Sequence, residues 1–471
     1  MRTLVWFRGK DLRVADHAPL ASAARDGEVI PLFVLDEHFF RPEAARRTPF
    51  RVQFLLESVA SLAANLEHLG SRLIVVGGRS VEVVPRLARR WKVDRVVAQS
   101  WVAPLGRDRD RRVAARLTVP FELFDTETLC RPGMLRTGAG APFSVFTAFA
   151  RAFRREVQVE APLGAPRRLP PVPREVKTHG DSLPALAGLG IAHNPQVLRG
   201  GESAARARLR SWLARDAKDY DELRDRPDLE GTSRLSADLK FGTLSIRAAW
   251  HAVDRKLRDL SPGALRVFQD ELLWREFAHS TLFDRPQLLE RPFQEKWRGF
   301  RWREDHAAWE AWVRGATGYP IVDAAARQLL ATGFVHNRAR MIAASFLAKH
   351  LLLDFRRGER HYFEMLADGD WANNDMGWQW SAGCGCDAQP WFRIFNPVAQ
   401  GLRFDPDGTY VRRWVPELSG LPGRYIHAPH EAPPDVLRGA GIRIGRDYPR
   451  PIVDHDFARK RFIEMARKHL G

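Results

Sequence analysis

Short runs of β-branched and aromatic residues alternate with helical apolar spacing over roughly the first 125 residues. The runs are TLVWF (3–7), EVIPLFVLD (28–36), RLIVVGG (72–78), RVVAQS (95–100) and PFELFD (120–125). Between them, apolar positions recur at helical spacing from Val52 to Leu66 and across residues 80–91. Strands that alternate with helices predict a doubly wound, five-stranded parallel sheet.

The pattern changes after this region. The segment APLGAPRRLPPVPREV (161–176) carries prolines that interrupt a helix and indicate an extended connector. From about residue 201 the apolar spacing is helical, for example over 262–282, with few strand signals. The sequence therefore predicts an α/β domain over 1–130, an interdomain linker over 131–200 and a mainly α-helical domain over 201–471.

Charge and apolar content narrow the class of protein. Of the 471 residues, 74 are Lys or Arg and 57 are Asp or Glu, so the formal net charge is +17. Such an excess is typical of proteins that bind a polyanion, although a generally cationic surface gives the same total. The N-terminal apolar run is too short for a signal peptide, and no stretch approaches the roughly 20 apolar residues of a membrane span. We expect a cytoplasmic protein without a membrane segment.

Two familiar kinds of site are not indicated. The three cysteines, Cys130, Cys384 and Cys386, cannot form a disulfide framework, and the single C-x-C has no second pair for zinc or an iron–sulfur cluster. No G-x-G-x-x-G follows the first predicted strand, so a dinucleotide site of the Rossmann type is not expected there. No metal ligand set is predicted.

A hydroxyl-rich segment, EGTSRLSADLKFGTLS (230–245), precedes a predicted helix. Thr232, Ser233 and Ser236 surround Arg234 there, and such side chains with free backbone N–H groups suit a phosphate or diphosphate. An ordinary helix cap beside a surface arginine would have the same pattern.

Two helical segments place polar groups among apolar ones. In QDELLWREFAHS (269–280), Glu271, Trp274 and Arg275 share one helix face, as in a binding site or in an amphipathic helix with a core indole. GFVHNRARMIAASFLAKH (333–350) begins an apolar helix with polar side chains that suit either binding or capping: His336, Asn337, Arg338 and Arg340.

The segment DGDWANNDMGWQW (368–380) is rich in indoles and polar groups. Asp368 and Asp370 could pair with an arginine such as Arg340, and Asn374 offers an amide that both donates and accepts. Indole faces stack on flat heterocycles, and amides bind their polar edges. A heterocyclic cofactor or flipped-out bases would both fit, and so would a small aromatic core with polar caps.

Together these segments resemble the DNA photolyase and cryptochrome family, from WFRGKDLRVADHAPL (6–20) almost to the last residue. The matching segments are EGTSRLSA (230–237), ELLWREF (271–277), TGYPIVDAAARQL (317–329), HNRARMIAASFLAKHLLLDF (336–355), DGDWANNDMGWQW (368–380) and FRIFNP (392–397). The resemblance implies an N-terminal α/β domain that can hold an antenna chromophore. It also implies a helical domain that binds FAD beside a cavity for a pyrimidine dimer of double-stranded DNA.

The resemblance assigns roles to individual residues. It implies contact with FAD for Tyr220, Thr232, Ser233, Arg234, Leu235, Ser236, Phe268, Arg275, Asn337, Arg340, Asp368, Asp370 and Asn374. It implies contact with the lesion or its DNA for Arg224, Glu271, Trp274, Asn337, Arg338, Met341, Trp380 and Arg393. Glu271, Trp274, Asn374 and Trp380 would be the catalytic set, with Asn374 facing flavin N5 and a neutral Glu271 donating to a thymine carbonyl.

The implied activity is light-driven repair of cyclobutane pyrimidine dimers by a monomer, with fully reduced FADH⁻ as electron donor. A (6-4) photolyase has histidines at the positions of Asn337 and Met341, which favours cyclobutane dimers. The alternative is a cryptochrome-type photoreceptor, which usually carries a C-terminal extension, whereas this sequence stops at Gly471 directly after its last predicted helix.

This chain departs from the family pattern at three places. Phe355 replaces the middle tryptophan of the photoreduction chain, between Trp378 and Trp302, so photoreduction should be slow or use another aromatic such as Trp312 or Tyr362. The loop FRGKDLR is one residue longer than usual, and Trp391 stands where tyrosine is common. The antenna chromophore stays unassigned, because the pocket residues match no pattern for folate, deazaflavin or flavin.

Overall fold

Five parallel strands form the predicted sheet in the computed structural model, which describes residues 1–177 and 180–471. The strands are β1 (Arg2–Phe7), β2 (Glu28–Leu35), β3 (Ile74–Gly77), β4 (Arg95–Gln99) and β5 (Phe121–Phe124). Their order in the sheet is β3-β2-β1-β4-β5, with Thr3 beside both Val29 and Arg95. The order runs outward in both directions from β1, so the sheet is doubly wound, as the alternating pattern predicts.

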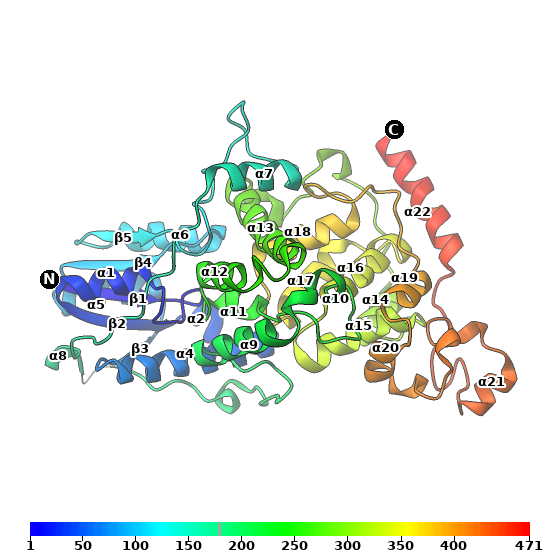
Figure 1. The fold of residues 1–471 in the computed structure, drawn as a ribbon, viewed down its shortest axis with the longest axis horizontal. Helices are drawn as coiled ribbons and strands as arrows, with labels where there is room; N and C mark the ends of the chain where they lie inside the picture. Colours follow the sequence, from blue (N-terminus) through cyan, green and yellow to red (C-terminus); the bar gives the residue numbers. More distant parts are fainter. Residues whose placement is uncertain (178–179) are drawn as a thin grey trace. The chain divides into compact units, whose positions relative to one another are not determined.

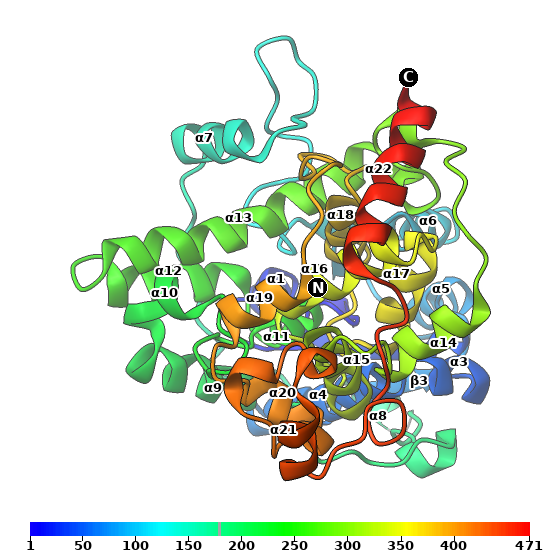
Figure 2. The same cartoon turned by 90° about the vertical axis from the view of Figure 1, so that its right-hand side faces the viewer.

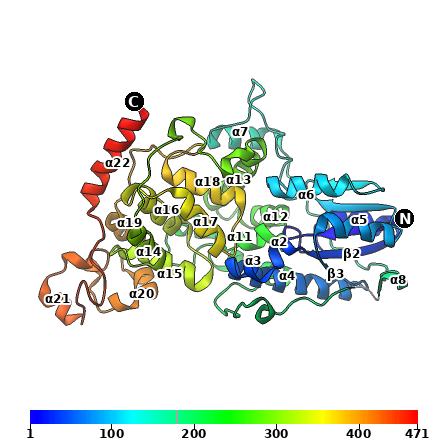
Figure 3. The same cartoon turned by 180° about the vertical axis from the view of Figure 1, so that it is seen from behind.

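Helices cover both faces of this sheet, as Figures 1 and 3 show from opposite sides. Val5 and Phe7 face one buried cluster, which includes residues of α1 (Ala18–Asp26) and α4 (Pro49–His68). Leu4 and Trp6 face the other cluster, which includes residues of α5 (Ser80–Arg90) and α6 (Pro104–Ala114). Because both faces are buried, the strands read as nearly continuous apolar runs.

The chain folds as two compact units, and each contains segments from separate parts of the sequence. The first unit comprises 1–221, 233–286 and 367–372; the second comprises 222–232, 287–366 and 373–471. Residues 178–179 of the predicted linker lie outside the described residues. The predicted domain boundaries at 130 and 200 stay a prediction.

The predicted linker is not entirely extended, because α7 (Phe146–Glu156) lies inside it. Phe149 and Phe153 of this helix are buried, and Figures 1 and 2 show α7 beside α13 (Pro262–Asp284). The prolines that indicated an extended connector come only after α7, so they say nothing about residues 146–156.

The other helices of the first unit are α2 (Glu37–Phe40), α3 (Pro42–Arg47), α8 (Arg174–Lys177), α9 (Glu202–Arg215), α11 (Ser236–Phe241) and α12 (Ile246–Leu257), and α10 (Tyr220–Leu223) begins in it.

Helices dominate the second unit, which ends in α22, drawn in red in Figure 2. They are α14 (His306–Arg314), α15 (Pro320–Thr332), α16 (Asn337–Ser345), α17 (Phe355–Met365), α18 (Trp371–Ala382), α19 (Pro397–Phe404), α20 (Thr409–Trp414), α21 (Pro434–Gly439) and α22 (His455–Leu470). Local chemistry sets their ends: the Asp305 side chain accepts from the backbone of Ala308 at the start of α14, and Gly315 ends it with φ 68°. Within the described residues, no helix is long and apolar enough to cross a membrane.

Candidate functional site

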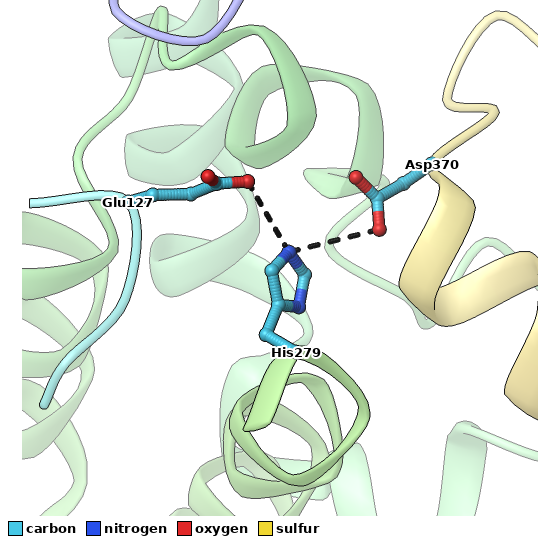
Figure 4. A group of neighbouring side chains, drawn as sticks. All are labelled: Glu127, His279 and Asp370. Atoms are coloured by element: carbon cyan, nitrogen blue, oxygen red, sulfur yellow. Dashed lines mark ion pairs between the residues drawn. The ribbon is translucent and has the colours of Figure 1, made fainter. Parts of the chain in front are cut away.

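A group of buried charged side chains lies in the first unit. Lys10 follows β1, Glu127 follows β5, His279 lies on α13 and Asp370 precedes α18. The Lys10 ammonium contacts Glu127 Oε1 and lies 2.8 Å from Asp370 Oδ2. Figure 4 shows His279 pointing between the two acids, with Nε2 3.4 Å from Glu127 Oε1 and 3.6 Å from Asp370 Oδ1. We call these four residues the Lys10 cluster.

Attraction inside the Lys10 cluster outweighs the cost of burial. Burial alone would raise the pKa of Glu127, but Lys10 and His279 lower it to about 2. Lys10, His279 and Arg275 likewise overcome burial and hold the pKa of Asp370 well below its usual range. Glu127, His279 and Asp370 offer ligand atoms within 4.8 Å of one another, as a metal site would. The Lys10 ammonium, however, already provides the cation that the carboxylates need.

Arg275, predicted to bind the cofactor, is buried beside this cluster on α13. Its Nη1 donates to the backbone carbonyl of Glu127 at 2.9 Å and lies 3.7 Å from Glu276. Glu276 accepts from the backbone N–H groups of Leu129 (2.9 Å) and Cys130 (3.3 Å). Burial raises the pKa of Glu276 to about 7. These bonds fix the chain after β5 against α13.

The predicted adenine-side residues form an aromatic group in the first unit. Tyr220 and Phe268 meet edge to face at 5.4 Å, and Trp212 lies 5.4 Å from Tyr220 and 4.8 Å from Phe268. The sequence did not single out Trp212. All three rings are buried, so they form a rigid apolar wall.

The hydroxyl-rich segment does not cap a helix in the simple way. The N-cap of α11 is Leu235, and no side chain caps this end. Arg234 has φ 52°, a left-handed conformation that is costly for a residue with a side chain. Non-glycine residues persist in this conformation where the surroundings demand it, often at binding sites, so the loop is compatible with the predicted diphosphate contact.

Trp274 has one face already covered. Its ring stacks on Phe146 of α7 at 3.8 Å and 6°. Glu271 lies one turn earlier on α13, and both residues are half-buried. Only the other face of the indole is available to a ligand. The predicted lesion contact is thus a tryptophan whose first face is covered by Phe146.

On α16 the predicted contacts divide into accessible and paired groups. Asn337 is exposed, and its Nδ2 lies 3.9 Å from Met341 Sδ one turn along the helix. Arg338 pairs with Asp225 at 2.7 Å and lies over the ring of Phe404. His336 caps the helix, and its Nδ1 accepts from the backbone of Arg338 at 3.2 Å.

The remaining predicted arginines lie in the second unit and differ in burial and in their partners. Arg340 donates from Nε to the carbonyl of Val335 at 2.7 Å. Arg224 is half-buried, 4.0 Å from Asp225, and Arg393 is exposed. The Arg393 carbonyl accepts from Lys349 at 2.9 Å, and burial lowers the pKa of Lys349 to about 7.

The tryptophans of 368–397 do not form one wall. Trp378 is buried in the core of the second unit, Trp380 is half-buried, and Trp371 is 36% exposed. These three residues lie on a helix, where each step turns the side chain by about 100°, so they point in different directions. The predicted roles of Trp380 in lesion contact and of Trp378 in electron transfer stay predictions.

Asn374, also on α18, has a defined orientation. Its Nδ2 donates to the carbonyl of Glu359 at 2.9 Å, so the amide oxygen is the end left to accept. Burial and mutual repulsion raise the pKa of Glu359 to about 9, and burial raises the pKa of Asp375 to about 7.

Aromatic rings surround Trp378. Tyr362 lies 5.1 Å from it and Trp312 lies 6.0 Å from it, both edge to face. Trp309 stacks on Trp312 at 5.6 Å and is half-buried. Trp302 contacts Phe355, the predicted break in the photoreduction chain, at 6.0 Å.

A cavity of about 620 Å³ lies at the carboxyl end of the sheet in the first unit. Asp36, Arg79 and Trp101, which follow β2, β3 and β4, contribute to its lining. Four more arginines line it: Arg41, Arg47, Arg109 and Arg112. Four acids also line it, Asp36, Glu37, Glu43 and Asp108. Ligands of doubly wound proteins bind at this edge.

The two units share the predicted flavin contacts. The first unit holds Tyr220, Ser233, Arg234, Leu235, Ser236, Phe268, Arg275, Asp368 and Asp370. The second holds Thr232, Asn337, Arg340 and Asn374. The individual roles of these residues stay predictions.

Sequence reasoning missed Lys10, Glu127 and His279. One signal was present: Lys10 lies in FRGKDLR, the loop that is one residue longer than usual. Glu127 and His279 gave no signal, because a single acid after a strand and a single histidine on a helix are common. Only the fold brings them to Asp370.

Comparison with known families defines the class of protein. The FAD-binding domain of DNA photolyase matches residues 268–468, and the DNA photolyase domain matches residues 3–171. The chain is thus a flavoprotein with an α/β domain and a helical FAD-binding domain. It belongs to the DNA photolyase family.

Curated relatives align over nearly the whole chain. The deoxyribodipyrimidine photo-lyase of Agrobacterium fabrum is 40% identical over 98% of this chain and 96% of its own. That of Thermus thermophilus is 42% identical over 98% of both chains.

Solved structures agree with the fold. A bacterial class III photolyase from Agrobacterium tumefaciens has a TM-score of 0.92 and 38% identity, covering 99% of this chain and 97% of its own. A Synechocystis cryptochrome has a TM-score of 0.90 and 31% identity, covering 98% and 99%. A Sulfolobus tokodaii photolyase with two FAD molecules has a TM-score of 0.83 and 28% identity, covering 99% and 100%.

Proposed function

We propose that this chain repairs cyclobutane pyrimidine dimers in DNA with blue light and reduced FAD. The observation that carries the proposal is full-length similarity, at about 40% identity, to enzymes named deoxyribodipyrimidine photo-lyase. The basic charge of +17 suits a DNA substrate.

The residues present fit a reduced flavin. The Asn374 amide presents an acceptor oxygen, which suits the N5–H of reduced flavin, and a neutral amide adds no charge beside an anionic ring. Tyr220 and Phe268 offer an apolar wall for adenine. When bound, reduced FAD supplies the light-driven transfer of one electron to the dimer and its return after the ring has split.

The chain's own residues would hold the dimer. Trp274 has one indole face left for stacking, and its Phe146 partner keeps that ring in place. Glu271 would hydrogen-bond a thymine carbonyl from the same helix. Asn337 and Met341, where (6-4) photolyases carry histidines, leave no acid–base pair there and favour a cyclobutane substrate.

DNA contacts would come from the predicted arginines. Arg393 is exposed and free to meet a phosphate, whereas Arg338 would have to exchange Asp225 for one. Photolyases are among the enzymes known to flip out their target bases, so extrusion of the dimer is not peculiar to this chain.

The arginine-lined cavity is the place for a second, antenna chromophore. The photolyase from Sulfolobus tokodaii contains two FAD molecules, one of them considered a light-harvesting cofactor. The ring of Trp101 suits a flat aromatic ligand, and the arginines and acids of the lining offer it donors and acceptors. Extraction and absorption spectroscopy of the purified protein would identify it.

The central experiment mixes the reduced protein with an oligonucleotide that contains one thymine dimer. Under blue light, base absorbance should recover, and a dark sample should not change. No recovery with reduced FAD bound would overturn dimer repair and make a (6-4) lesion the next substrate to test.

A cryptochrome-type photoreceptor is the second candidate, favoured by the similarity to the Synechocystis cryptochrome. Binding to damaged and undamaged DNA at several salt concentrations distinguishes the two. A repair enzyme should prefer the lesion and lose affinity steeply as salt rises. A photoreceptor should show little preference for the lesion.

A further inference from the structure

The backbone around Lys10 is held in place. The buried Gln99 side chain donates to the Lys10 carbonyl at 2.9 Å. Two residues further on, the backbone N–H of Leu12 donates to the backbone carbonyl of Phe241 at 3.2 Å. Gly242 lies so close that a Cβ there would collide with the Lys10 carbonyl. The Lys10 side chain therefore starts from a fixed point and reaches Asp370, 360 positions away in the sequence.

One hydrogen bond orients the His279 ring. Its Nδ1 lies 2.8 Å from the carbonyl of Arg275, which only accepts, so Nδ1 carries a proton. Nε2 faces the two carboxylates at 3.4 and 3.6 Å. Lys10 is the cation that contacts both of these carboxylates, Glu127 and Asp370.

Compensation of these charges matters because the four groups are buried. An uncompensated charge in such a place is much more costly than a complete pair. Asp370 has the second task of starting α18, since its Oδ1 accepts from the backbone of Ala372 at 3.1 Å. Its carboxylate is thus held from two sides, by Lys10 and by the helix start.

We propose that Lys10 is a positioning residue of the flavin site, which fixes the Asp370 carboxylate and offsets the negative charge that Asp370 and Glu127 carry. The inference rests on the proposed function, in which Asp370 faces the flavin's polar edge. Through Asp370, the loop after β1 sets the electrostatic potential at the flavin. Loss of the Lys10 charge leaves a net negative charge that disfavours the anionic, reduced flavin.

The test measures the midpoint potential of bound FAD in the full-length holoprotein. Lys10→Met should shift the potential to more negative values, and Glu127→Gln should shift it to more positive values. The double variant restores the charge balance and should lie close to wild type. A double variant that keeps the full negative shift of Lys10→Met would instead indicate a structural defect, because removal of the second, opposite charge should cancel an electrostatic effect.

The chain offers a matched control. Arg8 and Asp110 form another buried ion pair of the first unit, at 2.5 Å, and the partner of Arg8 in this pair is Asp110 rather than Asp370. Arg8→Met with Asp110→Asn should leave the flavin potential at the wild-type value. A shift as large as that of Lys10→Met would overturn the specific role of Lys10.

Two outcomes separate the inference from the proposed function. If the wild-type protein binds no FAD, the proposed function fails; if FAD binds and the charge variants leave its potential unchanged, only the inference fails. Should Lys10→Met not fold, the Glu127→Gln variant decides. A positive shift of the flavin potential supports the inference, and an unchanged potential overturns it.

Discussion

The interiors of the two units are stabilised in different ways. Around Lys10 the first unit buries four ionisable side chains that come from four separate segments. Around Trp378 the second unit buries aromatic rings at centroid distances of 5.1–6.0 Å. A charged cluster depends on keeping every partner, whereas an aromatic cluster depends on volume and shape. The two regions should therefore fail under different mutations.

The largest expected effect comes from removing one charge. Lys10→Met leaves Glu127 and Asp370 without their shared cation and should lower the free energy of unfolding by about 3–5 kcal/mol. Urea unfolding measures this loss. Adding Glu127→Gln should recover part of it, and an unchanged urea midpoint for Lys10→Met would show that the cluster is not a stability determinant.

The aromatic region should respond to added volume. Gly358→Ala puts a methyl group against the rings of Trp378 and the side chain of Leu347, so it should destabilise the protein by about 1–3 kcal/mol. The matched control is Gly377→Ala, also in a helix but with open space around it, which should stabilise by about 0.5–1 kcal/mol. Stabilisation by both substitutions would contradict tight packing at Trp378.

The two regions should also respond oppositely to pH. Glu127 has a pKa of about 2 in the fold, below its ordinary 4.5. Its contribution to the free energy of unfolding is therefore complete above pH 4.5 and is lost as the pH falls toward 2. Glu359 and Asp375 have raised pKa values of about 9 and 7. Their contribution to the free energy of unfolding is therefore complete at acid pH and is lost as the pH rises through these values.

Unfolding free energies between pH 2 and 9 test this contrast, with an expected loss of about 3 kcal/mol on the acid side, because the pKa of Glu127 lies about 2.5 units below its ordinary value. Glu127→Gln should flatten the change below pH 4.5, and Asp375→Asn should flatten the fall in stability between about pH 4 and 7. The same pH profile in both variants would refute the assignment of each window to one region.

The smallest expected effect concerns electron supply to the flavin. Because Phe355 interrupts the usual chain, Trp312→Phe should slow photoreduction of bound, oxidised FAD about tenfold, which equals about 1.4 kcal/mol in the barrier. Trp302→Phe should have little effect, since Trp302 contacts Phe355. Absorbance under blue light with a thiol reductant gives both rates, and a greater loss in Trp302→Phe would reverse the preferred route.

Local pattern predicted the framework of this protein well. The five strands are where alternating apolar runs indicated them, and long helices such as α13 and α15 follow the 3.6-residue spacing. Helix α7 was not predicted, because the proline-rich pattern begins only after it. The indoles of α18 left a binding site and a small aromatic core both open, and helical rotation places Trp378 in the core.

The sequence by itself determined the doubly wound sheet, the helical region and membership of the photolyase family, because these depend on local periodicity and on ordered motifs. Only the tertiary structure decided which charges meet. Lys10 joins Glu127 across 117 positions and Asp370 across 360, and no local pattern encodes such a contact. The reason is physical: a buried charge is stable only with its partners, and folding alone brings those partners together.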